Sequence, residues 1–146
     1  MKKLRFLWIL TGALLSGGLA YWAPVHAEGK TETPVPTPRA APAIWQAIDQ
    51  QTAALGRAIQ AGRFGEVHHR AYAIRDLALT LPAHSSALPP DKLVQVKANL
   101  PFIATLAQRL DATGDARDKA GTESNFRKLQ QVLTAIRANY PETIRK

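Results

Sequence analysis

The sequence predicts an all-α protein, an antiparallel up-down-up-down four-helix bundle that follows a signal peptide and a proline-rich linker. In four segments after residue 42, apolar residues recur at steps of three and four, which places each set along one helix face. Short links containing glycine or proline separate these segments, and the chain after residue 27 has no alternating strand pattern. Helices with one apolar face and short links pack as antiparallel neighbours.

Residues 1–27 have the three-part pattern of a secretory signal peptide. Residues 1–5 are cationic, residues 6–23 are almost unbroken apolar, and Val25-His26-Ala27 is a suitable cleavage site. An uncleaved membrane anchor is the alternative, because the apolar run approaches the ~20 residues that span a bilayer. We expect cleavage after Ala27, export to the periplasm and no stable membrane span afterwards.

Residues 28–42 are expected to form a disordered or semi-rigid linker, because proline recurs there every second or third residue. Such a segment could hold the domain away from a membrane or partner, or simply be a soluble start of the exported chain. The domain proper is expected over residues 43–141, with residues 142–146 as a C-terminal tail.

Charge and composition exclude several classes of function. Three of the 19 Lys and Arg residues but none of the 11 acidic residues lie in the signal, so residues 28–146 carry 16 cations against 11 acids, a net +5. The cations alternate with acids, as on a solvated helical surface, and no basic face for nucleic acid is evident. The chain has no cysteine, which excludes thiolate metal sites, cysteine-dependent catalysis and Cys-x-x-Cys-His haem attachment.

The first two helices are expected over residues 43–61 and 63–81. Gly62 provides a left-handed stop between them, and Pro82 ends the second helix. The apolar face of the first helix comprises Ile44, Trp45, Ile48, Thr52, Leu55 and Ile59. The apolar face of the second comprises Val67, Ala71, Ile74, Ala78 and Leu81, extended backwards by Phe64.

The third helix is expected from Pro90, which suits a first turn, to Gly114, which closes it. Pro101 lies inside its pattern and cannot bond to the Lys97 carbonyl, so a kink is predicted there. A split into two helices is the alternative, but the apolar stripe continues in phase. That stripe comprises Leu93, Val96, Leu100, Ile103, Ala107 and Leu110.

The fourth helix is expected to begin at Asp115, a suitable N-terminal cap, or alternatively near Thr122. Pro141 stops it. Its apolar stripe comprises Phe126, Leu129, Leu133, Ile136 and Tyr140.

Few residues could carry chemistry. His68 lies at the boundary of the second helix and His69 on its outer side, where His69 and Glu66 are three residues apart. The metal site that the sequence offers therefore consists of His68, His69 and Glu66, and the alternative is a boundary His68 hydrogen-bonded to a neighbour or water.

Other cofactors and reactions find no support in the residues. Non-covalent haem needs an inward histidine or methionine, whereas Met1 is the one methionine. The acids Asp111, Asp115 and Asp118 at the link between the third and fourth helices could bind a hard cation, but capping is their commoner role. We expect no cofactor and no catalytic residues.

The segment Val67-His68-His69-Arg70-Ala71-Tyr72-Ala73-Ile74-Arg75-Asp76-Leu77 resembles small exported helical-bundle proteins of Gram-negative bacteria. The resemblance extends to Leu110-Asp111-x-x-Gly114-Asp115 and Tyr140-Pro141. The implied architecture is similar to that of periplasmic four-helix cytochromes, although the chain lacks their haem motif and methionine ligand. Some related bundles are linked with metal stress, which implies metal handling.

Together these observations favour an exported, non-enzymatic binding protein with a metal- or stress-associated accessory role. The alternative is an interaction module for another envelope protein, without metal, for which Tyr72, Arg75 and Leu79 on one flank of the second helix are the candidate contact residues. Expected partners are thus a metal ion or an envelope protein, and not nucleic acid.

Overall fold

The computed structural model describes residues 40–145, so the predicted signal peptide and nearly all of the predicted linker lie outside the described residues. This part of the chain is helical throughout and contains no strand. The helices are α1 (Ala41–Gln60), α2 (Val67–Thr80), α3 (Pro90–Asp115), α4 (Lys119–Arg137) and α5 (Glu142–Arg145), with 3₁₀ turns η1 (Phe64–Glu66) and η2 (Leu81–His84). Between residues 40 and 145 no helix combines the length and apolarity needed to cross a bilayer.

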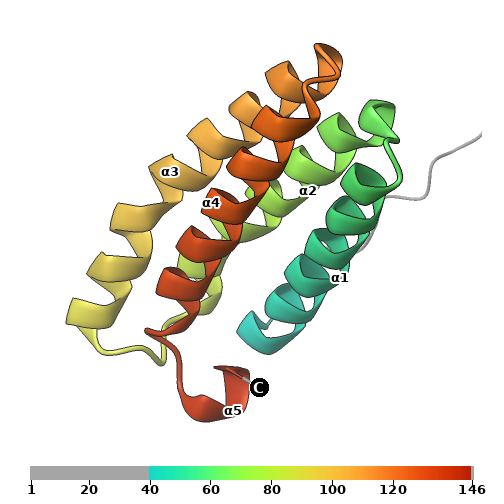
Figure 1. The fold of residues 1–146 in the computed structure, drawn as a ribbon. Helices are drawn as coiled ribbons and strands as arrows, with labels where there is room; N and C mark the ends of the chain where they lie inside the picture. Colours follow the sequence, from blue (N-terminus) through green and yellow to red (C-terminus); the bar gives the residue numbers. More distant parts are fainter. Residues whose placement is uncertain (1–39, 146) are drawn as a thin grey trace, which may run out of the picture. The chain divides into compact units, whose positions relative to one another are not determined.

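The four long helices lie side by side around one apolar core (Figure 1). Contacts are most extensive between α1 and α2, α2 and α3, and α3 and α4, whereas α1 meets α4 less closely. The largest completely buried core side chains come from all four long helices and η2: Trp45, Ile44, Ile48, Leu55, Ile59, Ile74, Leu81, Ile103, Leu110, Leu129, Ile136 and Val67. The predicted apolar faces are therefore the faces that form the core.

Helix α1 begins at Ala41, two residues earlier than predicted, because Pro42 is accommodated in its first turn. Its end is as predicted. Gly62 has a φ of +68°, which favours glycine, and its N–H donates to the Ile59 carbonyl (3.1 Å). The Arg63 N–H then donates to the Ala58 carbonyl (2.9 Å), completing a Schellman motif.

The second predicted helix is divided into η1, α2 and η2. The α-helix ends at Thr80, one residue before its predicted end, and Pro82 lies at the start of the 3₁₀ turn η2 that follows, where a missing N–H is tolerated. The Ser85 hydroxyl then donates to the Leu81 carbonyl (2.6 Å), satisfying an acceptor at this end.

Helix α3 passes through Pro101 without interruption, which excludes the split into two helices. The kink at Pro101 stays a prediction. Gly114 does not close the helix but is buried within it, where an added Cβ would lie 3.1 Å from the Val67 Cβ. The left-handed residue after α3 is Arg117, with a φ of +53°.

The cap of α4 is Asp118, not Asp115. The Asp118 Oδ1 atom accepts a hydrogen bond from the Gly121 N–H (2.9 Å), whereas Asp115 ends α3. Because the chain makes one extra turn at Ala116 and Arg117, both predicted starts were wrong, the first too early and the second too late. The expected tail likewise includes the short helix α5.

Candidate functional site: a polar groove between α1 and α4

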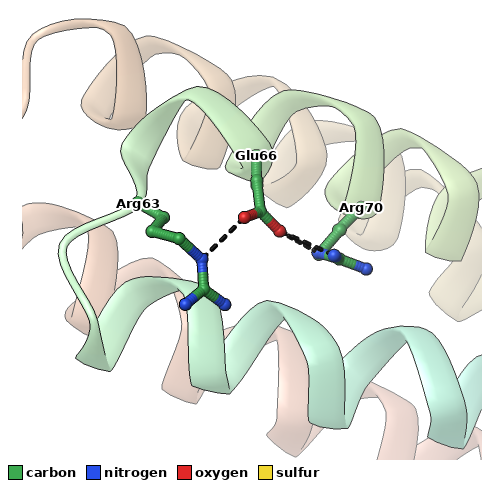
Figure 2. Close-up of polar contacts among 3 residues, drawn as sticks. All are labelled: Arg63, Glu66 and Arg70. Carbon is green, nitrogen blue, oxygen red and sulfur yellow. Dashed lines mark hydrogen bonds and ion pairs between the residues drawn. The ribbon is translucent and has the colours of Figure 1, made fainter.

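Glu66, a residue of the predicted metal site, is held by two arginines (Figure 2). Its carboxylate accepts hydrogen bonds from Arg63 Nε (2.6 Å) and Arg70 Nη2 (2.6 Å). The bonds from Arg70 and Arg63 lower the pKa of the Glu66 carboxyl from its ordinary value of 4.5. Both of its oxygens are thus engaged by cations, which compete with a metal ion.

The two histidines of the predicted metal site lie on the exposed side of α2. His68 Nδ1 is 2.8 Å from Asp111 Oδ1 on α3, and the His68 side chain remains 51% exposed. The His69 ring lies edge-on to it, with ring centroids 5.3 Å apart. Across residues 40–145 the structure contains no group of three or more His, Asp or Glu side chains able to hold a metal ion.

The predicted interaction residues surround His68. The Tyr72 ring lies 4.7 Å from the His68 ring, and the Arg75 guanidinium stacks 4.2 Å from the Tyr72 centroid. The Tyr72 hydroxyl also reaches Asp111 Oδ2 at 3.5 Å. Leu79, further along α2, is exposed. The structure thus brings His68, Tyr72 and Arg75 together and links His68 and Tyr72 to Asp111.

A different site lies between α1 and α4, where the helices approach less closely. It is a groove of about 420 Å³ that includes a residue of α5 at one end. The groove is lined by Trp45, Asp49, Thr52, Gln130, Leu133, Thr134, Arg137, Ala138 and Arg145. Trp45, Asp49 and Thr52 are four and three residues apart on α1, a spacing that places them on one side of that helix.

Arg137 links the two sides of the groove. It lies in the last turn of α4, where a cation is favoured by the helix dipole. Its guanidinium carbon stacks 4.3 Å from the ring centroid of Trp45, and its Nη2 donates to Asp49 Oδ1 at 2.5 Å. The arginine side chain is 22% exposed, so these contacts fix a guanidinium that is mostly shielded from solvent.

Three buried side-chain polar atoms have no hydrogen-bond partner among the described residues: Trp45 Nε1, Thr52 Oγ1 and Arg137 Nε. All three of these residues line the groove. Leaving a buried donor or acceptor unpaired costs about 1–3 kcal/mol, so such atoms are few in folded proteins. Three such atoms therefore belong to residues that line one groove.

Tyr140 and Ser85 form the neighbouring buried polar pair. The Tyr140 hydroxyl lies 2.7 Å from Ser85 Oγ, and its ring meets Trp45 edge-on, with centroids 5.5 Å apart. Burial raises the pKa of the Tyr140 hydroxyl above its ordinary value of 10.0, and the Ser85 bond and the Trp45 indole lower it in part. The Trp45 Nε1 atom thus lies near the Tyr140 hydroxyl but outside hydrogen-bond geometry, and it has no other partner among residues 40–145.

The groove residues were not predicted as a site. The apolar pattern places Trp45 and Thr52 on the core face of the first helix and gives no signal at Arg137. A threonine on an otherwise aliphatic stripe, next to a tryptophan with its own N–H, was the available signal. Compared with protein-family models, with curated proteins and with solved structures, the chain shows no match.

Proposed function

We propose that the protein is an exported, periplasmic and non-enzymatic binding protein, built as an antiparallel up-down-up-down four-helix bundle, that carries a small molecule in the groove between α1 and α4. The observation that supports this function is the set of unpaired buried polar atoms on Trp45, Thr52 and Arg137. A ligand with complementary polar atoms would satisfy them, and its binding would offset their desolvation.

The composition of the groove supports binding over catalysis. Its lining consists of apolar groups, hydroxyls, an amide and two arginines, with Asp49 as the acid. Asp49 is already paired with Arg137, and the Thr134 hydroxyl donates to the Gln130 carbonyl of its own helix (2.9 Å). This set offers directional hydrogen bonds but no base placed to activate a nucleophile.

The experiment is native mass spectrometry of the full chain after incubation with the small-molecule fraction of bacterial envelope extract. A Thr134→Trp substitution would fill the groove from an exposed position of α4. Thr105→Trp is its matched control, since Thr105 is also exposed and its hydroxyl also donates four residues back, to the Pro101 carbonyl (3.0 Å).

We expect a small-molecule adduct on the wild-type chain and on Thr105→Trp, and its loss from Thr134→Trp. Two results would contradict the proposed function: no adduct on the wild-type chain, or an adduct that Thr134→Trp retains equally.

A metal- or stress-associated accessory role is a second candidate, supported by the His68–Asp111 contact. A carboxylate that holds Nδ1 of a histidine leaves Nε2 for a ligand, as at many metal sites. Calorimetric titration with copper, zinc and nickel tests this role. An absence of heat at micromolar metal, or equal affinity in a His68→Ala/His69→Ala variant, would exclude these histidines.

An interaction module for an envelope protein is a third candidate, supported by exposed apolar side chains. Leu79 is 48%, Val94 62% and Phe102 59% exposed, on α2 and α3. Solution scattering tests the simplest form of this candidate, in which two copies of the chain associate through their exposed apolar side chains and form a dimer. A compact monomer at high protein concentration would weaken this candidate.

A further inference from the structure

We infer that the ligand of the groove is a small organic carboxylate. This inference rests on the proposed function and names its ligand by chemical class. The donors of the groove, its charge and its size all favour such a ligand.

The unpaired atoms are mainly hydrogen-bond donors. Trp45 Nε1 and Arg137 Nε can only donate, whereas the Thr52 hydroxyl can donate or accept. Because the guanidinium stacks on the indole at 4.3 Å, these two donors belong to groups in direct contact. A ligand that meets either donor must present an acceptor oxygen, and a carboxylate presents two.

The charge of the groove also favours an anionic ligand. Arg137 and Arg145 line it against the single acid Asp49. Asp49 is 58% exposed and already accepts from Arg137 Nη2, so its charge is partly solvated and partly neutralised. Two arginines against one acid leave the groove lining with a net positive charge, which favours an anion over an amine.

The size and the remaining lining favour an organic anion over an inorganic one. A volume of about 420 Å³ lies in the range of about 300–1,000 Å³ that small-molecule sites occupy. Leu133 and Ala138 add apolar surface beside the donors. An anion with a compact apolar body would contact both parts, whereas phosphate would leave the apolar part unfilled.

The test uses matched probes of one shape and different charge: benzoate, benzamide and benzylamine, with inorganic phosphate as a fourth. Trp8→Phe and Trp22→Phe in the full chain leave Trp45 as the one tryptophan, so its fluorescence reports on the groove. We expect benzoate to bind saturably and at least about tenfold more tightly than the other three probes, since a charge-assisted hydrogen bond is worth roughly that ratio.

Two substitutions separate an anion site from a cation site. Arg137→Gln removes the guanidinium donors and is expected to weaken benzoate binding about tenfold or more. Asp49→Asn removes the competing carboxylate and is expected to tighten benzoate binding. Arg57→Lys is the control: Arg57 is exposed on α1, does not line the groove, and its replacement should leave the affinity unchanged.

Each other outcome overturns the inference. Equal binding of benzamide would show that the groove does not discriminate between ligands by charge. Preferred binding of benzylamine, if Asp49→Asn abolishes it, would identify a cation site. Equal binding of phosphate would exclude an organic anion. If no probe binds, the carboxylate inference fails, whereas the adduct experiment with Thr134→Trp still decides the proposed function. Thr52→Val gives a second test should Arg137→Gln fail to fold.

Discussion

At the scale of single residues, two threonines show how a buried hydroxyl affects stability according to its partner. The Thr122 hydroxyl donates to the Asp118 carbonyl (2.6 Å), and the residue is completely buried. The Thr52 hydroxyl is also buried but has no partner among residues 40–145. Both lie on helices and both can be replaced by valine, which has nearly the same shape.

We expect the two valine substitutions to change stability in opposite directions. Thr52→Val should raise the free energy of unfolding by about 1 kcal/mol, because it removes an unpaired buried hydroxyl. Thr122→Val should lower it by about 1 kcal/mol, because it removes a satisfied one. Urea unfolding followed by circular dichroism measures both values. Equal losses in the two variants would show that Thr52 has a partner in the free protein.

Tyr140 gives an expectation at alkaline pH. Its pKa is raised in the folded state, so its contribution to stability is complete below pH 10.0 and is lost as pH rises through the folded pKa. Tyr140→Phe should therefore flatten the fall in stability above pH 10.0 and, by breaking the Ser85 bond, cost about 1 kcal/mol at neutral pH.

Urea unfolding at several pH values measures this, with Tyr72→Phe as the control because the Tyr72 side chain is only partly buried. A fall in stability above pH 10.0 that persists unchanged in Tyr140→Phe would show that Tyr140 is not its cause.

At the scale of elements, the two helix ends formed by Schellman motifs use different residues for the left-handed position. After α1 that residue is Gly62, whereas after α3 it is Arg117. The Arg117 N–H donates to the Gly114 carbonyl (2.9 Å) and the Asp118 N–H to the Thr113 carbonyl (2.9 Å), so the hydrogen bonding matches that after α1. A side chain at positive φ costs about 1–2 kcal/mol, which Gly62 avoids.

We expect Arg117→Gly to raise the free energy of unfolding by about 1 kcal/mol, because glycine tolerates this backbone conformation. Thermal unfolding measures the change, and Arg109→Gly is a contrasting control, since glycine within α3 is destabilising. A lower stability in Arg117→Gly would show that the Arg117 side chain contributes contacts that outweigh the backbone strain.

Gly114 gives a second expectation at this scale. Gly114→Ala should lower the free energy of unfolding by about 1 kcal/mol. The added Cβ would lie 3.1 Å from the Cβ of the completely buried Val67, so one helix must shift, and this cost should exceed the roughly 1 kcal/mol that alanine gains over glycine within a helix. Gly65→Ala is the control, since nothing lies within 4 Å of its added Cβ. Similar stabilities of the two alanine variants would contradict a close approach of α3 to α2 at Gly114.

These two positions show what the sequence could predict of the elements. The glycine signal at Gly62 gave the correct helix end, because no packing demand competes there. Gly114 gave the wrong helix end, because its glycine serves a contact with Val67 on another helix. The cap was misplaced from Asp118 to Asp115 for a different reason: the turn at Arg117 carries no glycine to mark it.

At the scale of the whole molecule, the apolar periodicity predicted which side of each long helix enters the core, from Ile44 to Tyr140. Periodicity fixes the direction of a side chain around its helix but not the distance between two helices. The groove depends on that distance, because α1 meets α4 less closely than consecutive helices meet. Asp49 and Arg137, which meet in the groove, are 88 positions apart in the chain. The groove residues could therefore not be grouped from the sequence.

Ligand binding should stabilise the whole fold, because a ligand of the folded state shifts the folding equilibrium. At a benzoate concentration ten times its Kd, the free energy of unfolding should rise by about 1.4 kcal/mol. The groove-filling Thr134→Trp variant should show no such rise, and Thr105→Trp should respond like the wild-type chain. Urea unfolding with and without benzoate measures this, and an equal rise in both tryptophan variants would place the ligand elsewhere.

The central claim, that a ligand oxygen meets the unpaired donors of the groove, is tested most directly by proton–nitrogen NMR of the Trp45 indole and Arg137 Nε groups during addition of benzoate. Both N–H proton signals are expected to move downfield together and to saturate at one Kd. The result that would contradict it is a titration in which both signals stay in place while resonances elsewhere on the protein shift.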